Sequence, residues 1–185
     1  MAHEGSPDEQ AAAGARPLSH IRAGPAGPES AMVDVSDKAS TRREALALAI
    51  VRFPPGLLAE VLAGGGPKGP VLEVARTAAI LAAKRTSDLI PLCHPLSLDV
   101  VELQFVALDA RRLEIRCRVA CTGRTGVEME ALTGATLAAL TVYDMTKARS
   151  HEIEIEQVRL QEKHGGRSGT WIRAAPGGDG PTLGP

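Results

Sequence analysis

Apolar residues recur along the chain with two different periods. A period of two, which is typical of β-strands, marks residues 96–108, 112–122 and 152–160. A period between three and four, which is typical of helices, marks residues 71–83 and a longer stretch from about 125 to 149. These patterns predict three strands and two helices of useful length.

Residues 41–53 fit both periods. Alanines at alternate positions are interleaved with Leu46, Leu48 and Ile50, which fits a strand buried on both faces, while the Ala and Leu content favours a helix. The next segment, 55–63, is the better helix, because it has Pro at its first turn and three glycines after its end. We therefore predict a strand at 41–53.

Finer patterns predict how these elements pack. Asp109-Ala110-Arg111 is a probable hairpin turn between two strands. Thr125 and Glu128 have the spacing of a capping box at the start of the long helix. The predicted inward faces are Val74, Ala75, Ala78, Leu81 and Ala82 on the first helix, Leu113, Ile115, Cys117, Val119 and Cys121 on the second strand, and Gly134, Ala135, Ala138 and Ala139 on the long helix.

The order β-α-α-β-β-α-β indicates an α+β fold, most simply a ferredoxin-like antiparallel sheet with helices packed on one face. We assign the domain to residues 18–172. The flanking segments 1–17 and 173–185 are rich in Ala, Gly and Pro and have little to bury, so they are predicted to be disordered tails.

Composition excludes several classes of protein. The net charge of −1 gives no general attraction to nucleic acid or an anionic membrane, and 2% aromatic residues disfavour base stacking. No apolar run reaches about 18 residues, and the N-terminus lacks a signal-peptide pattern, so we expect a cytoplasmic protein without a membrane span. Three cysteines do not suit a disulfide framework, and Cys117 and Cys121 have no partners at metal-ligand spacing.

The richest chemistry lies at residues 84–95, where cations, a carboxylate, a thiol and an imidazole are bounded by two prolines. Cys93-His94 could supply a thiolate nucleophile. Adjacent residues in an extended chain point in opposite directions, however, so the two need not act as a pair. We favour His94 as an acid, base or hydrogen-bond donor and Cys93 as a lining residue.

Charged residues on the long helix are further candidates. Asp144 and Lys147 are three residues apart and therefore adjacent on the helix surface, an arrangement that an ordinary ion pair explains as well as an active site does. Glu130 lies fourteen residues earlier, about 21 Å away along the axis. If both ends are functional, a site shared by two subunits becomes attractive. Several cations could hold a polyphosphate if the fold brings them together: Arg43, Lys68, Lys84, Arg85 and Lys147.

Five segments, within a match over residues 18–171, resemble the molybdenum cofactor biosynthesis protein C family, the cyclic pyranopterin monophosphate synthases. They are Met-Val-Asp-Val-Ser at 32–36, Ala-Lys-Arg-Thr at 83–86, Asp-Leu-Ile-Pro-Leu-Cys-His-Pro at 88–95, Thr-Gly-Arg-Thr-Gly-Val-Glu-Met-Glu-Ala-Leu-Thr at 122–133 and Tyr-Asp-Met-Thr-Lys-Ala at 143–148. Thr146 stands where many members have Cys. Lys-His-Gly-Gly-Arg-Ser-Gly at 163–169 replaces the more usual Lys-Ser-Gly-Gly-Lys-Ser-Gly.

The resemblance implies an enzyme that converts 3',8-cyclised dihydro-GTP into cyclic pyranopterin monophosphate and releases pyrophosphate. It also implies a homohexamer, a trimer of dimers, with sites at the dimer interface. The implied catalytic residues are Asp144, Lys147 and Lys68, and the implied substrate-binding residues are Leu92, Cys93, His94, Met129, Glu130, Arg43, Lys84 and Glu128. No cofactor is required on this reading. Magnesium can accompany the triphosphate, but no ligand cluster in the sequence demands a metal.

Two other functions are compatible with such a fold. A non-catalytic ferredoxin-like module that binds a phosphorylated metabolite would account for the cations without any reaction. An RNA-binding sheet would need exposed aromatic residues on its strands, and Phe105 alone is too few.

Overall fold

A computed structural model describes residues 21–65 and 68–174, which divide into two units between Val33 and Asp34. The hairpin unit consists of β1 (Ile21–Gly24) and β2 (Gly27–Ser30), paired antiparallel with Ile21 opposite Ser30. The predicted tails at 1–17 and 173–185 lie outside the described residues, apart from 173–174. Their disorder therefore stays a prediction, as do the domain boundaries.

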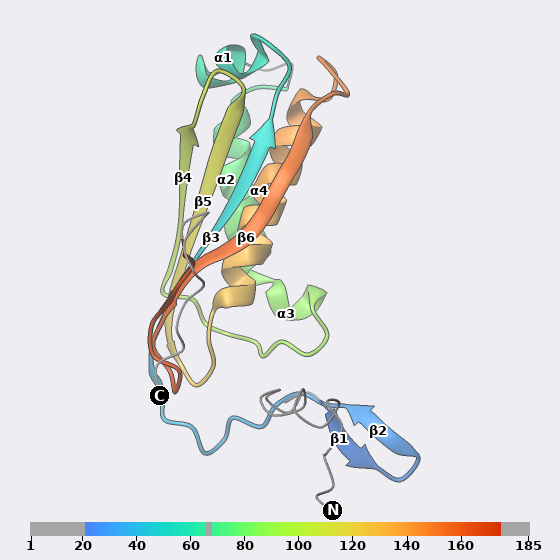
Figure 1. The fold of residues 1–185 in the computed structure, drawn as a ribbon, viewed down its shortest axis with the longest axis vertical. Helices are drawn as coiled ribbons and strands as arrows, with labels where there is room; N and C mark the ends of the chain where they lie inside the picture. Colours follow the sequence, from blue (N-terminus) through green and yellow to red (C-terminus); the bar gives the residue numbers. More distant parts are fainter. Residues whose placement is uncertain (1–20, 66–67, 175–185) are drawn as a thin grey trace, which may run out of the picture. The chain divides into compact units, whose positions relative to one another are not determined.

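The sheet unit, which begins at Asp34, contains all the other elements. These are β3 (Thr41–Arg52), α1 (Leu57–Leu62), α2 (Val71–Lys84), α3 (Thr86–Leu89), β4 (Val100–Ala107), β5 (Arg112–Gly123), α4 (Glu128–Thr146), β6 (Glu154–His164) and β7 (Trp171–Ile172). The strands are ordered β4-β5-β3-β6-β7, and every neighbouring pair is antiparallel (Figure 1). Without β7 this is the ferredoxin-like order, so the predicted fold is confirmed.

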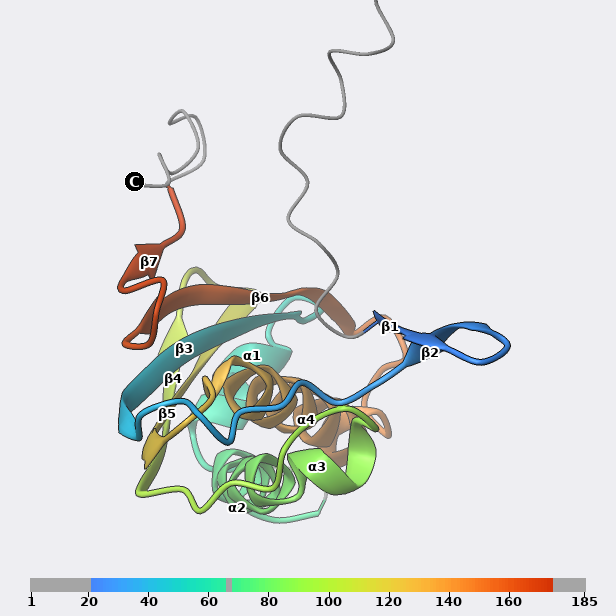
Figure 2. The ribbon, with the colours of Figure 1, turned by 90° about the horizontal axis from the view of Figure 1, so that it is seen from below.

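Both long helices cover the same face of this sheet (Figure 2). Strand β3 lies at the centre, and its residues Ala45, Ala47 and Ala49 are fully buried beneath the helices. The prediction of a strand at 41–53 is therefore confirmed, and the apolar alternation outweighed the helical propensity of alanine and leucine. No helix among the described residues is long and apolar enough to cross a bilayer.

Close contact between α4 and the layers around it depends on Gly134. A Cβ atom at this position would lie 2.6 Å from the Cys117 Sγ atom of β5 and 3.5 Å from the Ala79 carbonyl oxygen of α2. The next residues on the same helix face, Ala135, Ala138 and Ala139, are fully buried, as predicted. Small side chains thus let α4 approach both the sheet and α2.

Three finer predictions were wrong. On α2, Val74 and Leu81 are 38% and 50% exposed, whereas Ala75 and Ala79 are fully buried. The narrow contact with α4 admits the small side chains and leaves these two larger ones outside.

The expected capping box of Thr125 and Glu128 is also absent. Helix α4 begins at Glu128 itself, two residues later than a box would require, and Val127 is the N-cap without a side-chain bond. The Glu128 carboxylate instead lies against Gly126, where a Cβ atom would be 1.9 Å from Oε2. Strand β4 likewise begins at Val100 rather than at residue 96.

The Gly134 contact makes a testable prediction about stability. In Gly134→Ala, overpacking against Cys117 costs roughly 1–3 kcal/mol, and better helix propensity offsets about 1 kcal/mol of this. We therefore expect the free energy of unfolding to fall by up to about 2 kcal/mol, measured by urea denaturation. In a Cys117→Ala background, which lacks the sulfur atom, the same substitution should be neutral or stabilising. An equal loss in both backgrounds would contradict this account.

Candidate functional site

The C-terminal end of α4 carries Asp144 in its last turn and Lys147 as its C-cap, and their side chains form an ion pair with 2.7 Å between Nζ and Oδ1. Lys68 reaches the same carboxylate from the loop before α2, with 2.9 Å between its Nζ and Asp144 Oδ2. The Lys68 ammonium also donates to the Asp144 backbone carbonyl at 3.2 Å. The three predicted catalytic residues therefore form one cluster, here called the lysine–aspartate cluster.

Local backbone geometry presents Lys68 to α4. Helix α1 ends in a Schellman turn, in which Gly65 N–H donates to the Glu60 carbonyl and Gly64 N–H to the Val61 carbonyl. Gly64 has a φ of 82°, which glycine adopts without strain, and Gly69 beyond the lysine has a φ of 100°. The loop is thus built from residues that permit sharp turns, with the cation between them.

Two ammonium groups hold the Asp144 carboxylate in its ionised form. Hydrogen bonds from Lys147 and then Lys68 lower the pKa of Asp144 to about 2, and the carboxylate in turn raises the pKa of Lys147. The cluster carries one net positive charge, which favours an anionic ligand. Asp144 is a weak proton acceptor in this arrangement, and it becomes a stronger one when a lysine moves away.

A second group of predicted residues lies at the other end of α4, in its first turn. Glu130 is only 4% exposed, and burial raises its pKa to about 7; a hydrogen bond from its own backbone amide lowers the pKa and the nearby Glu128 charge raises it. A carboxyl group with a pKa near neutrality can be protonated or ionised under ordinary conditions. Glu130 is thus suited to bind a polar group or exchange a proton.

Residues 84–95 reach the same end of α4 through a short helix. The Thr86 hydroxyl donates to the Ala83 carbonyl at 3.0 Å, which closes the end of α2, and α3 then contacts α4. A turn with 3.0 Å between Cys93 N and the Ile90 carbonyl sets the direction of the following residues. The segment is thus folded locally before it presents Cys93 and His94.

The Cys93 thiol is not prepared for nucleophilic attack. Burial raises its pKa, and the negative charge of Glu130 raises it further, so both effects favour the neutral thiol. Cys93 therefore fits the lining role that we favoured from the sequence. The buried Cys117 behaves similarly, because burial raises its pKa to about 12.

Arg43 supplies a nearly buried cation at this end. Its guanidinium donates from Nε to the Gly123 carbonyl at 3.1 Å and from Nη2 to the Arg124 carbonyl at 3.4 Å, and it is 9% exposed. Among the described residues, no carboxylate forms an ion pair with it. Its charge and that of Glu130 both act on the Cys121 thiol, so Arg43 and Glu130 share a neighbourhood. We call Arg43, Cys93 and Glu130, together with His94, which follows Cys93 in the chain, the Glu130 cluster.

The other predicted substrate-binding residues flank the Glu130 cluster. Glu128 and Met129 precede Glu130 in the first turn, Met129 is 38% exposed, and Leu92 precedes Cys93. Lys84 is the last residue of α2 and is exposed beside α3.

Asp34 is a candidate that the sequence did not single out. Its Oδ1 atom accepts hydrogen bonds from the Ser36 backbone amide at 2.8 Å and from the Ser36 hydroxyl at 2.6 Å. These bonds lower the pKa of Asp34, and the charge of His94 lowers it further. The Asp-x-Ser spacing signals a local turn. The proximity of Asp34 to His94, in contrast, depends on the tertiary structure.

The turn at residues 163–169 packs against the start of β3. Gly165 and Gly166 have φ values of 90° and 77°, and a Cβ atom on Gly166 would lie 1.9 Å from Arg43 Nη1. Lys163 donates to the Ser168 hydroxyl, and His164 Nε2 lies 3.6 Å from Glu162 Oε2. The segment therefore supports Arg43, whatever else it binds.

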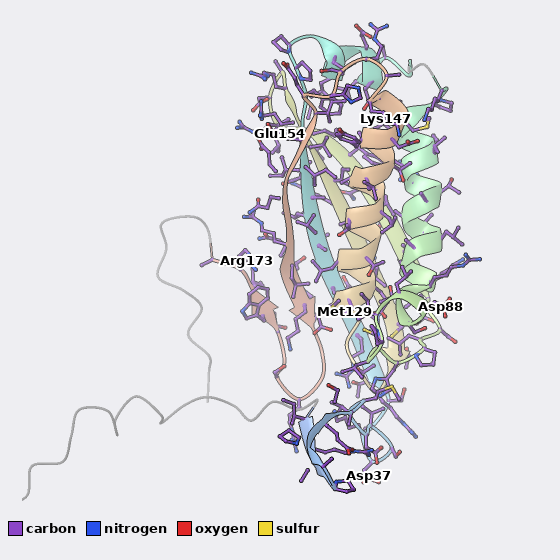
Figure 3. The ribbon with its side chains drawn as sticks, turned by 90° about the vertical axis from the view of Figure 1, so that its right-hand side faces the viewer. Asp37, Asp88, Met129, Lys147, Glu154 and Arg173 are labelled. Carbon is purple, nitrogen blue, oxygen red and sulfur yellow. The ribbon has the colours of Figure 1, made fainter. Side chains whose placement is uncertain are left out.

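The two clusters cannot meet in one chain. Fourteen residues of helix separate Glu130 from Asp144, which at 1.5 Å per residue is about 21 Å. Figure 3 shows the same separation, with Met129 and Lys147 at opposite ends of α4. Within the described ranges, no group of three or more His, Cys, Asp or Glu side chains is placed to hold a metal ion.

Comparisons with known proteins point to one family. A model described as the MoaC family matches residues 32–166. The cyclic pyranopterin monophosphate synthase of Chloroflexus aggregans is 53% identical over 157 residues, covering 84% of this chain and 93% of the relative. The synthase of Chloroflexus aurantiacus strain J-10-fl is 55% identical over 143 residues, covering 77% and 88%. That of Novosphingobium aromaticivorans is 51% identical over 157 residues, covering 85% and 98%.

The raised pKa of Glu130 predicts a pH-dependent stability. The folded carboxyl has a pKa of about 7, and its ordinary value is 4.5. Its ionisation therefore leaves the free energy of unfolding unchanged below about pH 4.5 and lowers it progressively as the pH rises from there through 7. Between pH 5 and 8 the free energy of unfolding should fall by about 2–3 kcal/mol more in the native protein than in Glu130→Gln. Urea denaturation at fixed protein concentration measures this difference. Equal pH dependence in the two proteins would show that the carboxyl is not held in this way.

Proposed function

Because the chain belongs to the MoaC family and its relatives are cyclic pyranopterin monophosphate synthases, we propose that it catalyses that reaction in molybdenum cofactor biosynthesis. The substrate is (8S)-3',8-cyclo-7,8-dihydroguanosine 5'-triphosphate, and the products are cyclic pyranopterin monophosphate and pyrophosphate. The observation that carries the proposal is the lysine–aspartate cluster, in which Lys68 joins Asp144 and Lys147 from 76 residues away.

The reaction needs proton transfers in both directions, because a purine-derived ring opens and a pterin ring closes. Lys147 and Lys68 can donate protons, and the Asp144 carboxylate can accept one. In the resting cluster, hydrogen bonds from both lysines suppress the basicity of Asp144. When Lys68 turns to a substrate phosphate or ring, the pKa of Asp144 rises, so substrate binding itself activates the base.

The Glu130 cluster has the complementary task of binding and orientation. His94 and Glu130 hold polar groups of the substrate, and Leu92, Cys93 and Met129 line the site. Arg43 and Lys84 supply positive charge toward the phosphates, with Glu128 among the polar residues of the site. The Arg43 guanidinium, nearly buried without an acidic partner among the described residues, supports this role.

Two subunits build each site in this proposal. The separation of about 21 Å along α4 exceeds what one compact ligand spans within one chain. In a dimer, one chain lends its lysine–aspartate cluster and the other its Glu130 cluster, and symmetry generates two such sites. Three dimers form the proposed homohexamer, which acts in the cytoplasm. The enzyme requires no cofactor of its own, and magnesium can enter with the triphosphate.

Turnover of the cyclised nucleotide tests the catalytic roles. In Asp144→Asn and Lys68→Ala proteins that still assemble, formation of pterin product and pyrophosphate should fall by roughly 10²–10⁴-fold, because a proton-transfer group is lost. Glu73→Gln is the matched control, since Glu73 also pairs with a cation three residues later on a helix surface. Near-normal turnover in both variants would discard the assigned roles. Binding of the nucleotide without consumption by the native protein would favour a non-catalytic module.

Mixed assemblies test the shared site. Asp144→Asn and Glu130→Gln proteins are each inactive in this proposal, but a mixed dimer contains one site with both defects and one site with neither. Random mixing after dissociation and reassembly should therefore restore about a quarter of native turnover. If each chain builds its own site, every site keeps one defect and no activity returns.

A further inference from the structure

The stretch of sequence that leads from α1 to Lys68 and on to α2 is rich in glycine. Its sequence between α1 and α2 contains Gly64, Gly65, Gly66 and Gly69, and glycine has the greatest backbone freedom of any residue. Yet the Lys68 ammonium is placed on one carboxylate at 2.9 Å. Contacts made on either side of this stretch can therefore decide where Lys68 lies.

Glu60 is the residue at which this loop leaves α1. Its backbone carbonyl accepts the Gly65 amide at 3.3 Å, which is the outer hydrogen bond of the Schellman turn. Its side-chain carboxylate is used separately and accepts a hydrogen bond from Arg149 Nη2 at 2.7 Å. One residue thus connects the base of the loop to a distant segment.

That distant segment is the end of α4. Arg149 lies two residues beyond Lys147, and its backbone amide donates to the Thr146 carbonyl at 2.8 Å, which closes the helix. The Glu60–Arg149 ion pair therefore joins the base of the Lys68 loop to the turn that carries Asp144 and Lys147. The Lys68 contact with the Asp144 backbone carbonyl joins the loop to the same turn a second time.

We propose that Glu60 and Arg149 are positioning residues, whose ion pair fixes the Lys68 loop against the end of α4 so that Lys68 meets Asp144. The proposal rests on the catalytic roles assigned above to Lys68 and Asp144. Neither Glu60 nor Arg149 touches the substrate in this account, and both act through the placement of Lys68.

The pair is exposed, and this decides how it can be tested. The side chains of Arg149 and Glu60 are 52% and 53% exposed, and ion pairs of this kind contribute little to overall stability. A displacement of about 1 Å in a catalytic group, by contrast, can lower a rate by as much as 10²-fold. Loss of the pair should therefore affect the lysine–aspartate cluster while the fold remains intact.

The first measurement is the pKa of Asp144, which carbon NMR of its labelled carboxyl group determines in a pH titration. Lys68→Ala sets the value reached when the lysine is lost. In Arg149→Ala and Glu60→Gln, the pKa should rise from about 2 toward that value, because Lys68 no longer stays on the carboxylate. In the exchanged pair, Glu60→Arg with Arg149→Glu, it should return toward the native value. The thermal midpoint of every variant should stay near that of the native protein.

Glu102→Gln is the control for these variants. Glu102 of β4 is 51% exposed, and its carboxylate lies 3.5 Å from the guanidinium of Arg118 on β5. Its substitution therefore removes a similar surface ion pair at a place away from Lys68. It should leave both the pKa of Asp144 and turnover unchanged.

The second measurement is turnover. Arg149→Ala should lower it about tenfold in the native background and have no further effect in Lys68→Ala, since the residue acts only through the lysine. An unchanged pKa of Asp144 in both Arg149→Ala and Glu60→Gln would overturn the proposal. A different result would separate the two proposals. If the pKa of Asp144 rises in Arg149→Ala and Glu60→Gln but turnover stays normal in them and in Lys68→Ala, the positioning role stands and the catalytic role of Lys68 is removed.

Discussion

The close approach of α4 to the sheet is the constraint on which the rest of the sheet unit depends. Gly134 leaves room for the Cys117 sulfur and the Ala79 carbonyl, and fully buried alanines continue the same face. This contact fixes one straight element of 19 residues, Glu128–Thr146, between the sheet and α2. Each cluster has its carboxyl group on that element, Glu130 in the first turn and Asp144 in the last. Packing at the middle of the helix therefore sets where the chemistry at its two ends can occur.

The two ends of α4 show how the surroundings give similar carboxyl groups different properties. Asp144 is exposed and held by two ammonium groups, which lower its pKa to about 2, whereas burial raises the pKa of Glu130 to about 7. Asp144 therefore stays ionised at neutral pH, whereas Glu130 can gain or lose a proton near neutrality. Carboxyl groups whose pKa values are driven apart in this way commonly divide the tasks of a reaction between them. Here two carboxyl groups of very different basicity lie at opposite ends of one helix.

Most of the fold could be predicted from residue patterns, because apolar periodicity reflects which face of an element is buried. Strand β3 was decided correctly against its own helical composition, since alternation at Ala45, Ala47 and Ala49 matched the buried face. The inward face of α2 was predicted incorrectly. Val74 and Leu81 are apolar, but they are too large for the close contact with α4 at Gly134. The site required more than patterns. The contact between Lys68 and Asp144, and the neighbourhood of Asp34 and His94, join segments far apart in the chain, and only the tertiary fold brings such charges together.

The turn after β6 has a consequence for how this protein can diverge in evolution. At Gly166 the backbone angle disfavours a side chain and the Arg43 guanidinium would have to move to make room for one, and at Gly165 the Arg42 carbonyl leaves no room. His164 and Arg167, which flank these glycines, are not fully buried, and they are the positions where the chain departs from the usual pattern of the family that it resembles. Positions 164 and 167 can therefore change more readily than positions 165 and 166, where any residue other than glycine would strain the backbone.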